Sequence, residues 1–243
     1  MVFAILAAGE GSRLAQEGVD VPKPLVKIQG EPMIDRLIRI FIQAGAEKIV
    51  IINNNIHGET LKHVRILIGQ GLPIELVVKT TPSSMHSFYE LSPLIGKGKF
   101  CLTTVDTIFK EEEFQAFIDA FKASADDGVM AVTDYIDDEK PLYISTDKAD
   151  YIMGFHDSLE QFHDSSADNG VNVCEVISGG IYCLNDKAFQ TLDKCISNGM
   201  SRMRNFQRQL IADGLKLKAF RFSKILDVDH AEDITKAEAF LQD

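Results

Sequence analysis

The stretch that decides the fold is Val2-Phe3-Ala4-Ile5-Leu6-Ala7-Ala8-Gly9-Glu10-Gly11-Ser12-Arg13, residues 2–13. Residues 2–8 are apolar at every position, which is typical of a strand that is covered on both faces of a sheet. The strand leads into a loop with two glycines and an arginine. Small residues let a phosphate approach backbone N–H groups, and a guanidinium can bind two phosphate oxygens. The pattern favours a phosphate-binding loop, and a two-glycine surface turn is the alternative. A dinucleotide-binding loop would need a third glycine where Leu14 stands.

A second short motif, Pro22-Lys23-Pro24-Leu25, follows the loop. The two prolines fix the backbone on either side of Lys23 and limit the positions that its ammonium group can reach. A rigidly presented ammonium group suits a phosphate, whereas a solvated lysine in a proline turn is the simpler interpretation of this motif alone. The loop that precedes it makes Lys23 a candidate binding residue.

Strand and helix patterns alternate through the first half of the chain. Apolar residues recur at helical spacing between Pro32 and Gly45, and buried-strand patterns separate further helices. The expected strands are 48–52, 74–78, 100–105 and 129–132, and the further helices surround residues 61–69 and 114–121. This alternation predicts an α/β protein with a Rossmann-like mixed, mainly parallel sheet that carries helices on both faces.

The pattern changes after Pro141. Two short strands, around Tyr143 and Tyr151, flank turn residues 147–150 and predict an antiparallel hairpin. Residues 156–172 are polar and have no sustained period, which predicts a mobile loop. The remaining expected elements are a strand at 174–184, helices near 186–196 and 203–212, a strand around 215–222 and a final helix from Glu232.

Composition and charge exclude several classes of protein. Of 243 residues, 45% are hydrophobic and 25% are charged, which is ordinary for a globular protein. The net charge of −11 has the wrong sign for holding a polyanion, which argues against nucleic acid and acidic membranes as partners. The apolar run at residues 2–8 has no basic segment before it and ends at Glu10, so we predict neither a signal peptide nor a membrane span. We therefore expect a cytoplasmic protein.

Together, the glycine loop and the Pro-Lys-Pro-Leu motif resemble the start of the nucleotidyltransferases that make nucleoside-diphosphate sugars. The signature of that family is a strand, then L-A-A-G-x-G-x-R, then P-K-P-L, and residues 28–34, Ile-Gln-Gly-Glu-Pro-Met-Ile, are similar to its turn into the first long helix. The resemblance implies the nucleotide-diphospho-sugar transferase fold in one domain, residues 1–243. Its nucleotide-binding half would be residues 1–135, and its sugar- or acceptor-binding half with the closing helix would be residues 136–243.

The resemblance also implies an enzyme that transfers a nucleoside monophosphate from a nucleoside triphosphate to a sugar 1-phosphate and releases pyrophosphate. Two serines stand where the family usually has the Gly-Thr pair that helps to hold the base, so the base cannot be read from this loop. The implied nucleotide-binding residues are Leu6, Ala7, Ala8, Gly9, Glu10, Gly11, Ser12, Arg13, Lys23, Ser83 and Ser84. The implied catalytic residues are Arg13, Lys23 and Asp106.

A metal site is implied by two acidic segments. Asp106 follows the apolar strand at 100–105, where open α/β sheets place ligand chemistry, and it is similar to the metal-binding Asp of the family. Residues 225–234 resemble the closing strand that carries a second acidic ligand. Asp229 is the first candidate and Asp227 the second, and the two can act together because alternate residues of a strand point to one face. Helix capping is the alternative role for Asp106 and Asp229. Such oxygen ligands suit Mg²⁺.

The acceptor is left open by the sequence. Residues 177–182, Ile-Ser-Gly-Gly-Ile-Tyr, resemble the segment that contacts the sugar in the family, and the resulting substrate-binding candidates are Gly179, Gly180 and Tyr182. A glycine pair at a strand bend explains the same residues. The alternative functions are a cytidylyltransferase that acts on phosphocholine or another small phosphate, a non-catalytic nucleotide-binding regulator, and a glycosyltransferase, although glycosyltransferases lack the two motifs. By family analogy alone, we expect a homo-oligomer.

Overall fold

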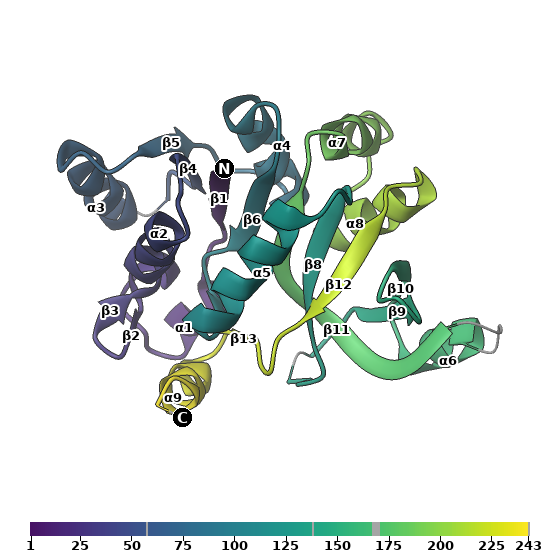
Figure 1. Cartoon of the computed structure of the whole chain (residues 1–243). Helices are drawn as coiled ribbons and strands as arrows, with labels where there is room; N and C mark the ends of the chain where they lie inside the picture. The colour runs from purple at the N-terminus through teal and green to yellow at the C-terminus, as the bar shows by residue number, and fades with distance from the viewer. Residues whose placement is uncertain (57, 138, 167–170, 243) are drawn as a thin grey trace. The chain divides into compact units, whose positions relative to one another are not determined.

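The structure is a computed structural model that describes residues 1–56, 58–137, 139–166 and 171–242 (Figure 1). The chain divides into two compact units: unit 1 comprises Met1–Ile108 and Leu226–Asp243, and unit 2 comprises Phe109–Ile225. The sequence-based prediction divided the chain differently, into residues 1–135 and 136–243. That residues 1–243 form one domain stays a prediction. Within the described ranges, every helix is too short or too polar to span a lipid bilayer.

Unit 1 is built on a parallel sheet with the strand order β6-β1-β4-β5. Val2 of β1 lies opposite Lys48 of β4 and Phe100 of β6, so the predicted all-apolar strands are neighbours. Their carboxyl ends share one edge, where the loops that follow them gather. The elements of unit 1 are β1 (Val2–Ala7), α1 (Ser12–Gln16), a 3-10 helix (Lys23–Leu25), β2 (Lys27–Ile28), β3 (Glu31–Pro32), α2 (Met33–Gln43), β4 (Lys48–Asn53), α3 (Gly58–Gly69), β5 (Ile74–Val78), α4 (Ser84–Ile95), β6 (Phe100–Thr104), β7 (Thr107–Ile108), β13 (Leu226–Asp227) and α9 (Ala231–Phe240).

Helices cover both faces of this sheet. The ring of Phe3 in β1 stacks on Phe41 of α2 with centroids 4.7 Å apart, and Phe100 in β6 contacts Phe88 of α4 at 5.7 Å. Because Phe100 is in register with Val2, it points to the face opposite Phe3. Helices α2 and α4 therefore pack on opposite faces. The predicted mixed α/β fold with helices on both faces is confirmed.

Unit 2 contains a mixed sheet with the order β12-β8-β11-β9-β10, in which only β12 and β8 are parallel neighbours among the described strands. Helix α5 packs on β8, and the ring of Phe117 in α5 contacts Phe220 and Phe222 edge-on. The predicted hairpin is present, because β9 and β10 pair antiparallel. The elements of unit 2 are α5 (Glu111–Ala123), β8 (Gly128–Thr133), β9 (Tyr143–Asp147), β10 (Ile152–His156), α6 (Leu159–Ser166), β11 (Val171–Leu184), α7 (Ala188–Ser197), α8 (Met203–Ala212) and β12 (Leu217–Arg221).

The loop expected at residues 156–172 is the main error in the sequence-based expectation. Residues 159–166 form helix α6 and strand β11 begins at Val171, while residues 167–170 lie outside the described part of the chain. Phe162 accounts for the helix, because its side chain is completely buried and packs with Tyr143 and Ile177. One aromatic residue anchors an otherwise polar helix, and such an anchor gives no visible period.

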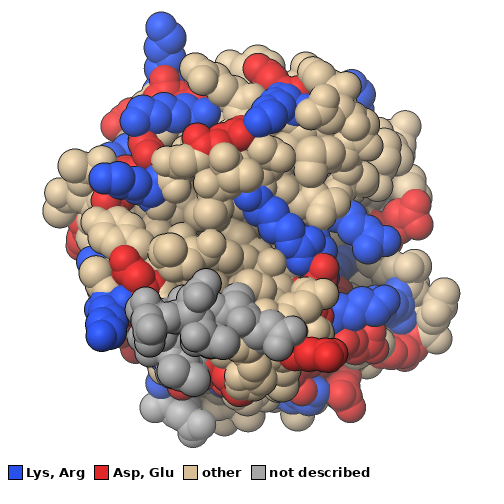
Figure 2. Space-filling model, turned by 90° about the vertical axis from the view of Figure 1, so that its right-hand side faces the viewer, with Lys and Arg blue, Asp and Glu red and all other residues tan. Residues whose placement is uncertain are grey.

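Charged side chains of both signs are intermixed on the surface shown in Figure 2. In unit 2, the carboxylate of Asp157 pairs with Arg204 at 2.5 Å and with Arg208 at 2.7 Å. These guanidinium groups lower the pKa of Asp157 below its ordinary value. Arg204 and Arg208 are thus both paired with an acidic neighbour.

Candidate active site

A cavity of about 420 Å³ in unit 1 collects most of the predicted site. It lies where the carboxyl ends of β1 and β6 meet the loop before α4. The predicted residues in its lining are Leu6, Ala7, Ala8, Gly9, Glu10, Gly11, Ser12, Arg13, Lys23, Ser83, Ser84, Asp106 and Asp229. The lining residues that sequence reasoning missed are Pro24, Thr81, Pro82, Ser87, Thr104 and Val105. Motifs that are far apart in the chain therefore share one hollow of the surface.

Gly11 is the point at which the two sequence motifs meet. Its φ of 63° lies in the left-handed region, which favours glycine. A Cβ at this position would come within 3.0 Å of the Cβ of Lys23. The loop can pass this close to Lys23 only because position 11 has no side chain, so the glycine and the lysine form one structural motif.

The side chain of Asn54 holds the glycine loop in place through two hydrogen bonds to its backbone. Its buried side-chain amide, at the end of β4, donates to the carbonyl oxygens of Ala8 at 3.1 Å and Gly9 at 3.0 Å. These two bonds fix the direction of the loop immediately after β1. The sequence pattern predicted the strand at 48–52 and gave no role to Asn54. An amide side chain at the carboxyl end of a buried strand was the available signal.

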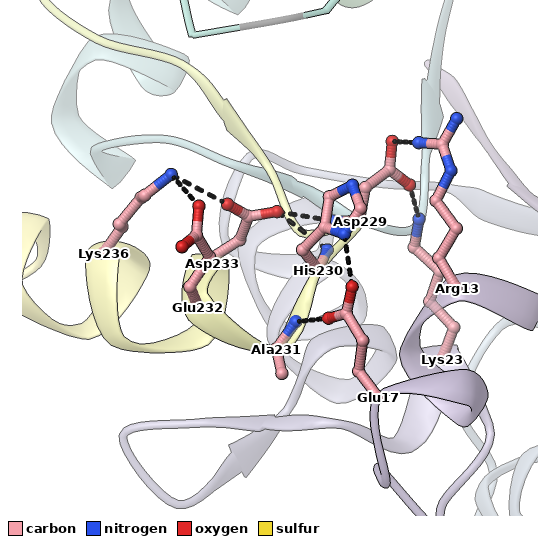
Figure 3. A network of polar contacts seen from close by, with 9 residues as sticks. All are labelled: Arg13, Glu17, Lys23, Asp229, His230, Ala231, Glu232, Asp233 and Lys236. Atoms are coloured by element: carbon pink, nitrogen blue, oxygen red, sulfur yellow. Dashed lines mark hydrogen bonds and ion pairs between the residues drawn. The ribbon is translucent and has the colours of Figure 1, made fainter.

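Lys23 joins the two carboxylates that were predicted to act together. Its ammonium group pairs with Oδ2 of Asp106 and, at 2.6 Å, with Oδ1 of Asp229. Arg13 donates to the other oxygen of Asp229 at 3.1 Å (Figure 3). Burial alone would lower the pKa of Lys23, but the charges of Asp106 and Asp229 outweigh it and raise this pKa above its ordinary value. The lysine therefore keeps its charge at any physiological pH.

Asp229 reaches this position differently from the sequence prediction. Strand β13 contains only Leu226 and Asp227, which pair with β7, so Asp229 lies beyond the strand. The N–H of Val228 donates to the carbonyl oxygen of Asp106 at 3.1 Å. This hydrogen bond holds the segment after β13 against Asp106, and the next residue, Asp229, lies beside Lys23. The alternation argument was wrong about the strand, although Asp229 lines the cavity as expected.

Asp227 is not part of the cavity lining. The side chain of Asp227 is exposed to solvent. Because Asp229 lines the cavity and Asp227 does not, Asp227 is the weaker candidate for binding a cation there. Asp229 remains the first candidate and Asp227 the second.

The residues present fit a hard divalent cation bound together with phosphate. Oδ1 of Asp106 is buried and has no hydrogen-bond partner, and an unsatisfied carboxylate oxygen of this kind is costly unless a cation or donor meets it. In the described ranges, no three carboxylate, imidazole or thiol side chains converge on one point. Mg²⁺ needs only one or two protein carboxylates, because it keeps water and phosphate oxygens as its other ligands. Asp106, with Asp229, can therefore hold Mg²⁺.

The opposite wall of the cavity consists of small hydroxyl side chains at the start of α4. The hydroxyls of Thr81 and Ser87 are 2.5 Å apart, and the hydroxyl of Ser83 is 2.9 Å from Nδ1 of His86. Ser83 is the residue immediately before α4, and its side chain does not cap the helix, since its hydroxyl bonds to the imidazole and not to a backbone N–H of the first turn. The wall offers hydroxyl groups at fixed positions for a polar ligand.

The predicted substrate-binding residues all lie in unit 2, on β11. A Cβ at Gly179 would come within 2.2 Å of Cδ1 of Ile225, and Gly180 has a φ of 73°, so both positions favour glycine for structural reasons. The side chain of Tyr182 is buried, and its hydroxyl accepts a hydrogen bond from Gln207 at 3.1 Å. Their contact with a substrate stays a prediction.

Residues 3–173 match the family of the MobA-like NTP transferase domain. Because the match covers more than half of the chain, the chain belongs to this family. The matched region contains the glycine loop, Lys23 and Asp106, whereas Asp229 lies beyond its end.

Two curated relatives are similar to part of the chain. The chain is 27% identical over 112 residues to a 2-aminoethylphosphonate cytidylyltransferase of Lancefieldella rimae, a match that covers 44% of each protein. It is 26% identical over 169 residues to an N-acetylmuramate alpha-1-phosphate uridylyltransferase of Caulobacter vibrioides, covering 66% of this chain and 64% of the relative. The chain thus matches less than two thirds of the length of either relative.

A solved structure resembles the whole chain. The inositol-1-phosphate CTP transferase of T. maritima has a TM-score of 0.78 at 17% identity, covering 100% of this chain and 96% of that one. At this identity the likeness shows the fold alone. It agrees with the nucleotide-diphospho-sugar transferase fold that the motifs imply.

Proposed function

We propose that the protein is a nucleotidyltransferase that transfers a nucleoside monophosphate from a nucleoside triphosphate to a sugar 1-phosphate. The observation that carries the proposal is the shared ion pair of Lys23 with Asp106 and Asp229, placed directly against the Gly11 loop in one cavity. The two named relatives transfer nucleotides to a phosphonate and to a sugar phosphate, which supports the reaction class.

The proposed reaction needs little from a protein base. An oxygen of the acceptor phosphate attacks the α-phosphorus of the triphosphate, the bond from this phosphorus to the bridging oxygen breaks, and pyrophosphate leaves with the bond electrons. A phosphate monoester has a second pKa of about 6, so the nucleophile is mostly dianionic at neutral pH. The remaining problems are to hold two anions together and to stabilise the charge that grows on the leaving oxygen.

Arg13, Lys23 and the loop backbone meet these needs. Both side chains bind a carboxylate in this structure, and each can bind a phosphate oxygen in the same way. The loop after β1 lines the cavity that would receive the triphosphate, and backbone N–H groups of such a loop can bind phosphate oxygens. Mg²⁺ held by Asp106 and Asp229 would supply further charge neutralisation on the phosphate oxygens.

A second acceptor class is favoured by one specific comparison. The cytidylyltransferase of Lancefieldella rimae acts on 2-aminoethylphosphonate, a small acceptor that is not a sugar. We therefore keep a cytidylyltransferase that acts on a small phosphate or phosphonate, such as phosphocholine, as the alternative. Both reactions use the same attack and release pyrophosphate, so the residues assigned above serve either acceptor.

The test is pyrophosphate release with each of the four ribonucleoside triphosphates against sugar 1-phosphates, phosphocholine and 2-aminoethylphosphonate, with and without Mg²⁺. Release with one pair, lost in Asp106→Asn, would establish the reaction and identify both substrates. A sugar 1-phosphate as the active acceptor supports the first proposal, and a small phosphate or phosphonate supports the second. Triphosphate binding without release for every acceptor would contradict both and favour a nucleotide-binding regulator.

A further inference from the structure

Glu17 connects the end of α1 with the start of α9. Its Oε1 lies 2.6 Å from Nδ1 of His230, and its Oε2 accepts the backbone N–H of Ala231 at 2.6 Å (Figure 3). We call these two contacts the clasp. None of the three residues lines the cavity, and neither the motifs nor the family match singles them out. The clasp joins segments more than two hundred positions apart in the chain.

The clasp acts on the residues immediately beside Asp229. On the other side of the same turn, Oδ2 of Asp233 accepts the backbone N–H of Asp229 at 3.1 Å and that of His230 at 2.8 Å. Successive N–H groups from 229 to 231 are therefore all bound by carboxylates, two by Asp233 and one by Glu17. This arrangement leaves the backbone of Asp229 little freedom, and it fixes the direction in which its carboxylate points.

The other end of the clasp acts on Arg13. The N–H of Glu17 donates to the carbonyl oxygen of Arg13 at 3.1 Å, so the two residues sit one helical turn apart. Arg13 in turn binds Oδ2 of Asp229. A closed ring of contacts therefore runs from Arg13 through α1 to Glu17, across to Ala231, and back through Asp229 to Arg13, as Figure 3 shows.

We propose that Glu17 is a positioning residue. It sets the distance between helix α1 and Asp229, and it thereby keeps the side chains of Arg13 and Asp229 within hydrogen-bond distance of each other. Glu17 touches neither substrate nor metal in this proposal and acts only through its neighbours. The proposal rests on the function proposed above, since Arg13 and Asp229 matter for turnover only if the cavity binds the triphosphate.

A second contact of α9 offers a matched control. The backbone N–H of Gln29 donates to Oε1 of Glu238 at 3.0 Å, and the side-chain amide of Gln29 donates to the carbonyl oxygen of Glu238 at 3.3 Å. Glu238 is thus a glutamate whose carboxylate also joins α9 to the N-terminal part of unit 1 through a backbone N–H. Among the hydrogen bonds of the described residues, those of Glu238 to Gln29 involve neither α1 nor the turn at 229–231. Truncating the Glu238 side chain removes this contact of α9 with Gln29 and leaves both contacts of the clasp in place.

The experiment compares Glu17→Ala, Glu17→Gln and Glu238→Ala. Supporting residues of this kind cost about 10- to 100-fold in activity when removed, and we expect Glu17→Ala to lose kcat in that range. The KM for the triphosphate should stay within about threefold, because Lys23 and the loop backbone remain in place. Glutamine has the same length and can accept the N–H of Ala231, so Glu17→Gln should recover most of the loss. Glu238→Ala should keep the wild-type kcat.

Amide hydrogen exchange of residues 229–233 is measured on the same variants without substrate. Faster exchange in Glu17→Ala, restored in Glu17→Gln, is expected. Unchanged exchange in Glu17→Ala, or an equal loss of kcat in Glu238→Ala, would overturn the proposal. If the wild type shows no turnover with any substrate pair, the proposed function fails, and the exchange result still decides whether Glu17 holds the turn that carries Asp229.

Discussion

At the scale of single residues, Lys23 determines the charge balance of the cavity. One ammonium group lies between carboxylates that arrive from two distant segments, Asp106 after β6 and Asp229 before α9. If Lys23 is removed, those carboxylates repel each other and a triphosphate meets net negative charge. The proline on each side of Lys23 keeps the ammonium group in this place.

We expect Lys23→Ala to lower kcat by about 10²- to 10³-fold, the usual cost of losing one electrostatic group that stabilises a transition state. Steady-state pyrophosphate release measures this loss. Lys27→Ala is the matched control, since Lys27 is exposed and does not line the cavity. Turnover of Lys23→Ala at the wild-type rate would remove Lys23 from the mechanism.

At the scale of elements, the site depends on what happens at the ends of strands. The loop after β1 is held by Asn54 at the end of β4, and Asp106 follows β6, all on the carboxyl edge of the parallel sheet. This arrangement explains why a cavity forms here, because the loops that leave neighbouring parallel strands gather at one edge.

Asn54→Ala should loosen the glycine loop. The carbonyl oxygens of Ala8 and Gly9 would lose their donor, and because Ala8 is half-buried and Gly9 exposed, each lost hydrogen bond costs about 0.5–1.5 kcal/mol of stability. Urea unfolding gives the change in free energy, and triphosphate titration should show weaker binding. Asn55→Ala is the control, because the exposed Asn55 side chain accepts only from Thr80 in the described contacts. Equal effects of both variants would contradict the role of Asn54.

Helix α6 depends on one buried ring, so Phe162→Ala should destabilise unit 2 strongly. Removing a fully buried phenylalanine costs about 3–5 kcal/mol. Chemical denaturation with a probe in unit 2 measures this cost. Leu159→Ala, at a position that is 38% exposed on the same helix, should cost far less. Similar unfolding midpoints for Phe162→Ala and the wild type would show that the ring does not anchor α6.

Most elements were predictable because their patterns are local. Strand β1 is apolar at every position and α2 shows a helical period, so their burial is visible in the sequence alone. Helix α6 was missed because the burial of Phe162 depends on Tyr143 and Ile177, which are distant in sequence. The loop and Lys23 were predicted from motifs, whereas Asn54 was not, since its partners lie 46 and 45 positions away.

At the scale of the whole molecule, the stability that His156 contributes should decrease in acid. His156 lies 2.9 Å from the hydroxyl of Ser145, and burial, followed by the charge of Arg208, lowers its pKa below 6.5, with Asp157 acting in the opposite direction. A lowered pKa means that the fold prefers the neutral imidazole. Its contribution is complete above a pH of about 6.5 and is lost as the pH falls through the folded-state pKa.

We therefore expect the contribution of His156 to stability to be lost between a pH of about 7.5 and a pH of about 5.5. His156→Asn should lose less over the same range, because it has no imidazole to protonate. Urea unfolding at both pH values measures the difference. His163→Asn, which removes a more exposed imidazole of unit 2, is the control. A pH dependence that is identical in wild type and His156→Asn would contradict this account.

A cytoplasmic location and a homo-oligomeric state stay predictions.

The measurement that tests the central claim most directly is ³¹P NMR of the wild-type protein with Mg²⁺, a nucleoside triphosphate and the acceptor that supports pyrophosphate release. The account predicts that pyrophosphate and a diphosphate-linked or phosphonate-linked nucleotide conjugate appear in equal amounts, and that Asp106→Asn forms neither. Formation of inorganic phosphate with a nucleoside diphosphate, or pyrophosphate release that needs no acceptor, would contradict it, because hydrolysis and not nucleotidyl transfer would then be the activity of this cavity.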